Sequence, residues 1–242
     1  MTQYPVPPAL APLLGSHEAQ EQLPVAFDPD RWARELQSVL SEDVVRLALE
    51  SEATTTLVRP GRRSVARQTI ATLADATDLT DDDQVLSLWL LMLAWGNGEQ
   101  SRWGFQNAAN ALAQPDVLLD NLRMTAAILR GAEDTDELAV AYRAWRPGSY
   151  VSESFFSKWF AFAGRRDGRI WQPLILDENV WKTLNDTLGL TVSDLVGSKK
   201  PAAKYQAYVE IVHEWAESPN HAQWIEWVLF SQNGKPVGGP IG

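Results

Sequence analysis

Apolar residues recur at helical spacing through most of this chain, and strand-like alternation is nearly absent. A period near 3.6 residues puts the apolar side chains on one face, which is typical of helices that pack around a core. The pattern predicts helices over residues 29–49, 63–75, 80–95, 101–113, 115–131, 134–145, 153–163, 178–188, 201–217 and 220–231. We therefore expect an all-α, compact multi-helix fold with little or no β-sheet.

Two segments depart from the helical pattern. Residues 1–25 contain five prolines and predict an irregular, Pro-rich N-terminal arm. Residues 170–176 indicate an extended piece, because Pro173 opposes helix and the next three residues form a short apolar run. The chain has 242 residues, 45% of them hydrophobic, which is enough for a sizeable core. We predict one helical domain over residues 26–242.

The composition excludes several kinds of chemistry. Cysteine is absent, which rules out disulfides and thiolate metal sites, and the three histidines show no metal-ligand spacing. We therefore expect no metal and no other cofactor. The chain has no apolar stretch of 18 residues and no basic, apolar leader, so we expect a cytoplasmic monomer without a membrane partner.

The net charge of −10 at pH 7 bears on nucleic-acid binding. Broad affinity for nucleic acids depends on Lys and Arg that neutralise phosphates, so any such site in this chain must be local. Basic residues gather at positions 59–67, 165–169 and 199–204. Solvated helix faces explain most clusters of this kind, so the clusters alone do not define an interface.

Lys158 and Asp177 are the clearest candidates for reactive side chains. On a helical wheel Lys158 lies at the edge of an aromatic face, and Asp177 directly precedes the predicted helix 178–188. A lysine that loses solvation has a lowered pKa, and its neutral amine is a nucleophile toward a carbon such as a sugar C1′. Each residue also has a structural interpretation. A boundary lysine can extend its ammonium into water, and an aspartate in that place is a favourable N-cap.

A series of short motifs surrounds this pair in a particular order. They are Ala94-Trp95-Gly96-Asn97-Gly98 with Arg102 and Gly104, Ala141-Tyr142-Arg143 with Pro147-Gly148, Phe155-Phe156-Ser157-Lys158, Phe162-Ala163-Gly164, Leu174-Ile175-Leu176-Asp177, and Tyr205 to Trp215 with Ala216. Across residues 80–217 the chain resembles bacterial proteins with an 8-oxoguanine DNA glycosylase fold. These are relatives of the helix-hairpin-helix DNA glycosylase superfamily.

The resemblance implies a reaction for the pair. Lys158 would attack C1′ of an extruded nucleotide, displace the base and form a Schiff base that permits strand cleavage at the abasic site. Asp177 would stabilise the positive charge that develops on the sugar and assist proton transfers, besides capping its helix. The implied partner is DNA that contains a modified base, and the nucleotide must leave the base stack to reach the enzyme.

The same resemblance suggests a base pocket and DNA contacts. Because apolar aromatics at helical spacing usually pack on other helices, each aromatic candidate for the pocket has an equally plain role in the core. The pocket candidates are Trp95, Gly96, Phe155, Trp159, Trp181 and Gln106, with Trp103, Trp171 and Asn107 as further possibilities. The candidates for DNA contacts are Arg102, Ser152, Ser154, Arg165 and Arg166.

One departure from the well-characterised glycosylases concerns duplex binding. Their hairpin carries a Leu-Pro-Gly-Val-Gly type turn before the lysine, whose amides hold a DNA phosphate. Residues 149–154 fill that place with Ser-Tyr-Val-Ser-Glu-Ser, where the serine hydroxyls can contact a phosphate and Glu153 opposes one. This difference suggests a substrate other than genomic 8-oxoguanine.

Three functions remain open at this point. The first is a DNA glycosylase, with or without lyase activity, for an oxidised or otherwise modified base; a narrower version excises bulky modified bases of phage DNA in antiviral defence. The second is a non-catalytic nucleic-acid-binding module on the same fold. The third is a helical protein-interaction module, which the acidic charge favours and the Lys158–Asp177 pairing disfavours.

Overall fold

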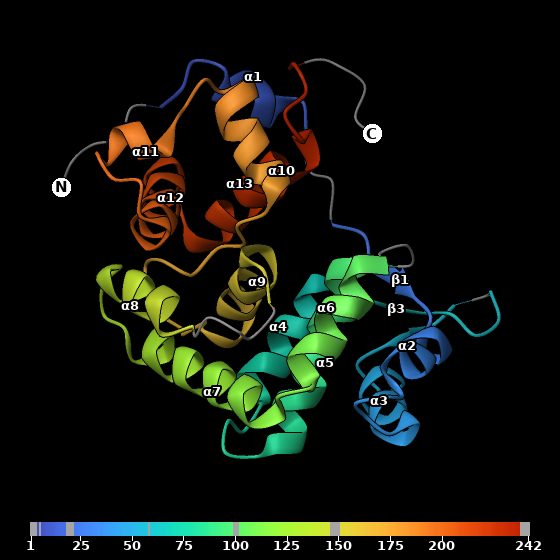
Figure 1. Cartoon of the computed structure of the whole chain (residues 1–242). Coiled ribbons are helices and arrows are strands. Elements are labelled where there is room, and N and C mark those ends of the chain that lie inside the picture. The colour runs from blue at the N-terminus through green and yellow to red at the C-terminus, as the bar shows by residue number, and fades with distance from the viewer. Residues whose placement is uncertain are drawn as a thin grey trace.

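The computed structural model describes residues 4, 6–17, 22–57, 59–98, 102–145 and 151–237, except for the side chains of residues 102 and 103. Helices dominate these residues, as Figure 1 shows. They are α1 (Leu10–Gly15), α2 (Pro29–Leu36), α3 (Glu42–Leu49), α4 (Arg67–Ala76), α5 (Asp82–Asn97), α6 (Arg102–Leu112), α7 (Pro115–Gly131), α8 (Asp136–Ala144), α9 (Glu153–Ala163), α10 (Glu178–Lys182), α11 (Val192–Leu195), α12 (Pro201–Trp215) and α13 (Pro219–Gln232). The π-helical turn η1 (Thr183–Thr187) continues α10. The predicted mostly helical fold is confirmed.

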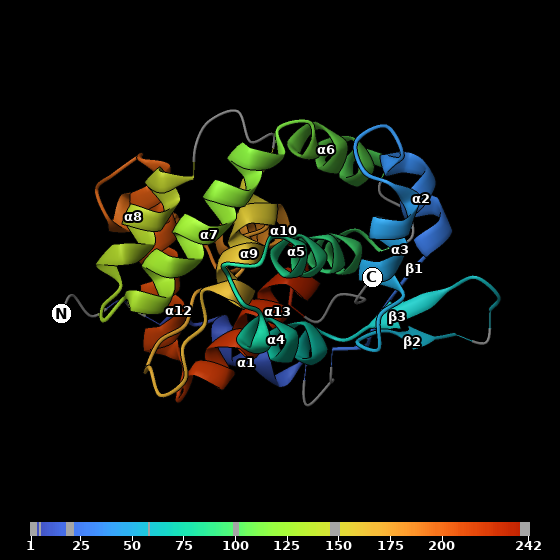
Figure 2. The ribbon, with the colours of Figure 1, turned by 90° about the horizontal axis from the view of Figure 1, so that it is seen from below.

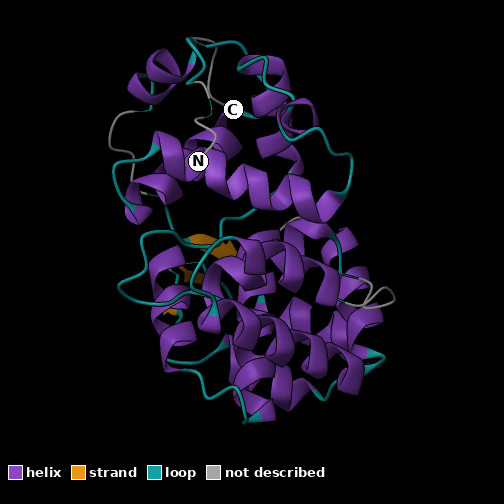
Figure 3. Cartoon of the chain, turned by 90° about the vertical axis from the view of Figure 1, so that its left-hand side faces the viewer, coloured by secondary structure: helices purple, strands orange, loops and turns teal. Residues whose placement is uncertain are grey.

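A small antiparallel sheet is the exception to the helical architecture (Figure 3). It consists of β1 (Val25–Phe27), β2 (Thr55–Thr56) and β3 (Arg63–Val65), with β3 in the centre. Val25 pairs with Val65, and Thr55 pairs with Ser64. The predicted helix over 63–75 is therefore wrong at its start, where the chain pairs as a strand, and the helix begins at Arg67.

Side-chain caps set the starts of several helices. Asp28 accepts the backbone N–H of Arg31 at the start of α2, and Asp81 accepts the backbone N–H groups of Asp83 and Gln84 at the start of α5. Ser41 accepts a backbone N–H at the start of α3. The predicted helix 29–49 is consequently two helices, because the Ser41 cap opens a second one.

Helix α9 occupies the centre of the molecule. It contacts α4, α5 and α7, and α5 and α9 lie in the middle of the view from below (Figure 2). Eight residues of α9 are buried, from Phe156 to Ala163. A helix that is apolar nearly all round belongs in the interior of a fold, so a polar residue on α9 lies in a low-dielectric environment.

The remaining elements surround this centre. In Figure 1, α1 and α10 to α13 form a group above α9, α4 to α8 lie around and below it, and α2, α3 and the sheet lie to one side. The Pro-rich arm contains α1, which contacts α13 and buries Leu10 and Leu13. No helix among the described residues is long and apolar enough to cross a membrane.

Residues 171–176 are extended and buried between these groups, in agreement with the prediction from Pro173. A buried backbone outside a sheet still needs hydrogen-bond partners. Side chains supply them here: the Tyr205 hydroxyl donates to the Leu174 carbonyl at 3.0 Å, and the Tyr208 hydroxyl donates to the Ile175 carbonyl at 2.9 Å. Both tyrosines belong to α12, so this helix orients the segment that leads to Asp177.

Candidate functional site

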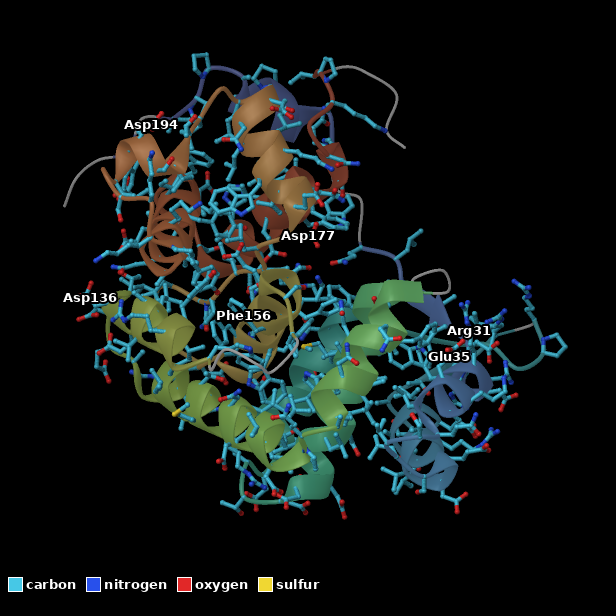
Figure 4. All side chains as sticks on the ribbon, viewed as in Figure 1. Arg31, Glu35, Asp136, Phe156, Asp177 and Asp194 are labelled. Carbon is cyan, nitrogen blue, oxygen red and sulfur yellow. The ribbon has the colours of Figure 1, made fainter. Side chains whose placement is uncertain are left out.

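A cavity of about 430 Å³ opens where α5 ends, α9 passes and α10 begins. Figure 4 places Asp177 at this junction, with α10 above it and α9 below it. Cavities of this size hold small ligands in many proteins. The lining combines apolar and aromatic walls with convergent polar groups: Gln22, Val25, Arg67, Trp95, Gly96, Asn97, Gly98, Lys158, Ile175, Asp177, Asn179, Val180, Glu226, Trp227 and Phe230.

Lys158 is buried in the wall of this cavity, with only 6% of its surface exposed. Its stem crosses the backbone of α5 at Gly96, where a Cβ atom would lie 3.0 Å from the lysine Cε. Its Nζ lies 5.2 Å from the centre of the Phe155 ring. The ammonium therefore does not extend into bulk water, and the alternative of a solvated boundary lysine is wrong.

Ser154 links the lysine to the aspartate. The Lys158 Nζ donates to the Ser154 hydroxyl at 2.7 Å and to the Ser154 carbonyl at 3.2 Å. The Ser154 hydroxyl in turn donates to the Asp177 Oδ2 at 2.7 Å, and the direct distance from Nζ to Oδ2 is 3.5 Å. An amine and a carboxylate thus share one hydroxyl at the cavity wall.

Asp177 also caps α10. Its Oδ1 accepts the backbone N–H of Asn179 at 3.0 Å, while its Oδ2 faces Ser154 and Lys158. The N-cap interpretation and the pairing interpretation are therefore both satisfied, because the two carboxylate oxygens have separate partners. The cap holds the carboxylate in a fixed direction, and the other oxygen stays in the cavity.

The electrostatics of the pair follow from its burial. Desolvation lowers the pKa of Lys158, and the nearby charges of Asp177 and Glu226 oppose that shift. Burial alone would raise the pKa of Asp177, but Lys158, the Asn179 N–H and the Ser154 hydroxyl together lower it. The site therefore favours a carboxylate beside an amine that gives up its proton more readily than an exposed lysine.

The close approach of Lys158 to Gly96 gives a testable prediction. In Gly96→Ala the new methyl group would lie 3.0 Å from Cε and 3.1 Å from Cδ of Lys158, so the lysine must move. The lysine has to give way by a few tenths of an ångström. A misplacement of about 1 Å at a reacting group costs up to roughly 100-fold in rate, so a smaller loss is expected here. We expect slower covalent trapping of Lys158 by borohydride on abasic DNA, measured as adduct formed per minute.

Gly131→Ala is the matched control for this substitution. Gly131 is also helical, and a Cβ there would meet no atom within 4 Å. Both substitutions favour the helix by similar amounts, but only the methyl group of Gly96→Ala crowds another side chain. Thermal unfolding of both variants checks that the fold is kept. If Gly96→Ala and Gly131→Ala trap at the same rate, the reaction does not depend on the present position of the Lys158 side chain over Gly96.

The structure separates the predicted pocket residues. Trp95 and Gly96 line the cavity, and Phe155 lies against the lysine. The Trp95 indole N–H is buried and has no hydrogen-bond partner among the described residues. The side chains of two further candidates, Arg102 and Trp103, lie outside the described part of the chain.

Other predicted pocket residues lie elsewhere. Trp159 is fully buried, and its indole N–H donates to the Leu122 carbonyl on the far side of α9, so it is a core residue. Trp181 packs against Tyr208 and Lys204 rather than in the cavity lining. Gln106 is exposed, and its side-chain amide donates to the Asn110 side chain. Asn107 is not among the residues that line the 430 Å³ cavity. Trp171 stacks on the Arg169 guanidinium.

The predicted DNA contacts also divide. Ser154 holds Lys158 and Asp177 instead of facing away from the site, whereas Ser152 is exposed at the start of α9. Arg166 forms a pair with Glu133, and Arg165 lines a second cavity beside α4. Ser149 and Tyr150 of the replaced hairpin lie outside the described residues.

Sequence reasoning missed several cavity residues on distant elements. Arg67 comes from α4, and Glu226, Trp227 and Phe230 come from α13. The side chain of Phe230 is 41% exposed, which is unusual for a phenylalanine and puts it at the open side of the cavity. A glutamate between Ile225 and Trp227 on an apolar helix was the available signal for this wall.

A lysine and a carboxylate that face one ligand-sized cavity make this junction the candidate reactive site of the described residues. The chain belongs to the OGG-like family: residues 18–230 match the family described as "Putative 8-oxoguanine DNA glycosylase OGG-like protein". The match confirms the resemblance predicted from the motif order. Neither a curated protein nor a solved structure matches the chain.

Proposed function

We propose that this protein is a DNA glycosylase that uses Lys158 as nucleophile and Asp177 as the supporting carboxylate. The observation that carries the proposal is the 3.5 Å separation of Nζ and Oδ2 in the wall of a cavity. Membership of an 8-oxoguanine DNA glycosylase family supports the class of reaction. The proposal takes residues 26–242 as one domain that acts as a monomer on DNA in the cytoplasm.

The proposed reaction starts with the neutral amine of Lys158. The amine forms a bond to C1′ of the extruded nucleotide, and the N-glycosidic bond breaks with its electron pair on the departing base. Asp177, within 3.5 Å of Nζ, takes up the proton that the amine loses and returns it to the base or sugar. Its negative charge also stabilises the positive charge that develops on the sugar.

After base departure the same lysine can continue to a Schiff base. The C1′–O4′ bond of the sugar ring then breaks, O4′ takes up a proton and becomes the C4′ hydroxyl, and C1′ is joined to Nζ by a C=N bond. Loss of a proton from C2′ then expels the 3′ phosphate, which gives the proposed lyase step. The enzyme has to hold the nucleotide out of the duplex throughout, at a cost of a few kcal/mol in lost stacking.

The substrate experiment is a panel of duplex and single-stranded DNAs with oxidised, alkylated, deaminated and glycosylated bases. We expect abasic sites to appear on at least one modified DNA and not on the unmodified strand. A narrower form of the proposal, excision of bulky modified phage bases in antiviral defence, predicts that the glycosylated DNAs react. The absence of the glycine hairpin before α9 supports this form. No abasic site on any member would contradict the proposed function.

The pKa shifts give the proposal a pH dependence. Lys158 reacts only as the neutral amine, and its lowered pKa means that this form appears below the ordinary lysine pKa of about 10.4. Asp177, with a lowered pKa, is already charged in acid. We therefore expect the single-turnover rate to rise with pH and to level off at a lower pH than it would for an amine with the ordinary lysine pKa. A rate profile with its midpoint at or above the ordinary lysine pKa would contradict a desolvated lysine nucleophile.

A further inference from the structure

Glu226 is a buried carboxylate that the proposed reaction does not use. It lies on α13 in the wall of the cavity with 3% of its surface exposed. Its Oε2 accepts the backbone N–H of Ile175 at 2.7 Å. Ile175 belongs to the extended segment and stands two residues before Asp177, so Glu226 holds the backbone that carries the carboxylate of the site.

Arg67 completes the environment of Glu226. The guanidinium donates to Oε1 at 2.7 Å and to Oε2 at 3.0 Å, which is a two-pronged pair between α4 and α13. A buried carboxylate is costly unless a charge and hydrogen bonds compensate it, and this geometry supplies both. The pair therefore ties together α4, α13 and the extended segment at one point.

The next backbone group of the segment is held from the other side. The Ser157 hydroxyl on α9 accepts the backbone N–H of Leu176 at 3.0 Å. Ser157 directly precedes Lys158, and Leu176 directly precedes Asp177. This hydrogen bond therefore fixes α9 and the segment relative to each other next to the two reacting groups. Glu226 provides the corresponding fixed point on the α13 side of the segment.

The same groups determine the charge around Lys158. Asp177 precedes α10, Glu226 comes from α13, and Arg67 comes from α4. The two carboxylates attract the ammonium and Arg67 repels it. The neighbouring part of α5, Trp95 to Gly98, contributes no titratable group.

We propose that Glu226, paired with Arg67, is a positioning residue of this site that fixes the Asp177 segment opposite Lys158 and balances the charge that the lysine experiences. The pair touches neither the sugar carbon nor the base bond in this role. Its kinetic consequence rests on the proposed glycosylase function. Its electrostatic consequence does not, because the lysine can be titrated without any substrate.

The first test is an NMR titration of the intact protein labelled with ¹³C at the lysine Cε, with the Lys158 signal assigned by its loss in Lys158→Arg. Glu226→Gln removes a negative charge, so the pKa of Lys158 should fall. Arg67→Gln removes a positive charge, so the pKa of Lys158 should rise. A shift of the Lys158 pKa in the same direction in both variants, or no shift in either variant, would overturn the proposal.

The double variant Arg67→Gln/Glu226→Gln keeps the test decisive if a single variant fails to fold. It removes both charges, retains a carbonyl acceptor for the Ile175 N–H, and allows the two carboxamides to bond each other. The pKa of Lys158 should return toward the wild-type value, because the two removed charges act on the lysine in opposite directions. A double variant that shifts as far as Glu226→Gln alone would show that Arg67 does not counter the charge of Glu226.

The second test measures base release on a DNA that the wild-type protein cleaves. Each single variant should lose about 10- to 100-fold in kcat with KM nearly unchanged, because a displaced Asp177 affects the reaction more than DNA binding. The double variant should recover most of this loss. Glu50→Gln, which breaks the exposed pair of Glu50 with Arg46 on α3, is the control and should retain activity.

The two tests separate the possible failures. Opposite pKa shifts without base release from any DNA would support the electrostatic role of the pair and remove the proposed function. Base release that is the same in wild-type protein and in Glu226→Gln would remove the positioning role and leave the proposed function standing. Near-ultraviolet circular dichroism of the eleven tryptophans checks that each variant keeps its packed core.

Discussion

Replacing Lys158 by alanine is expected to abolish the borohydride-trapped complex and to lower base release by about 10³-fold or more, the scale of losing a principal reacting group. Among the described residues that line the cavity, Lys158 is the one lysine, and its side chain is 7% exposed with Nζ 3.5 Å from Asp177. Without it, C1′ has no protein nucleophile. The measurement is the yield of covalent protein–DNA complex by gel, beside single-turnover base release.

Stability must be separated from reactivity in this experiment. Removing Lys158 leaves the Asp177 carboxylate without its buried counter-charge, which destabilises the fold, while its bonds to Ser154 and Asn179 remain. We therefore expect a lower melting temperature with the fold retained. Lys158→Met preserves the volume of the stem that crosses Gly96 and should lose activity as fully as the alanine variant. A large recovery in the methionine variant would show that packing, not the amine, is required.

Lys182→Ala is the matched control for the lysine. Lys182 is exposed on α10 and pairs with Glu178 at 3.0 Å, so its removal affects a surface pair of little energetic weight. The control should form the trapped complex at the wild-type rate. If the covalent complex still forms in Lys158→Ala but no longer forms in Lys182→Ala, our proposal has assigned the reaction to the wrong lysine.

Substituting Asp177 by asparagine is expected to lower base release by about 10²- to 10⁴-fold while the protein stays folded. Asparagine is also a good N-cap, so the carboxamide oxygen can still accept the Asn179 N–H. The negative charge beside Lys158 is lost, and with it the stabilisation of the sugar cation. The measurement is single-turnover base release together with thermal unfolding.

A second aspartate provides the comparison for this variant. Asp81 caps α5 by accepting two backbone N–H groups, and it is distant from the cavity lining. Asp81→Asn should match Asp177→Asn in its small effect on stability, of about 1 kcal/mol or less, and should retain full activity. If Asp177→Asn unfolds the protein while Asp81→Asn does not, Asp177 serves the fold rather than the reaction.

Local sequence patterns predicted most of the helices and singled out Lys158 and Asp177 as candidates, for physical reasons. The aromatic face over 153–163 and the N-cap position of Asp177 are local features that depend on neighbouring residues. Spacing could not decide whether Lys158 is solvated, because that depends on what packs over its helix. The answer comes from Gly96 on α5, whose missing side chain leaves room for the lysine stem.

The partners of the site on α4 and α13 lay beyond sequence reasoning. Arg67 and Glu226 are 159 positions apart in the sequence and form one pair in space. Likewise, the strand at 63–65 depends on a partner at 25–27, so local periodicity assigned it to a helix. The family resemblance made Trp159 a candidate for the pocket, whereas the side of α9 on which it lies faces α7.

The segment before Asp177 lies outside helices and strands, as a loop does, but it is buried and held by side-chain hydrogen bonds, as core residues are. Loops usually accept insertions and deletions because few contacts fix their backbone. Here hydroxyl groups of Tyr205, Tyr208 and Ser157 each take a particular backbone group of residues 174–176. Adding or removing one residue would put a different backbone group opposite each of these side chains, so the contacts fix the length of this connection as well as its path.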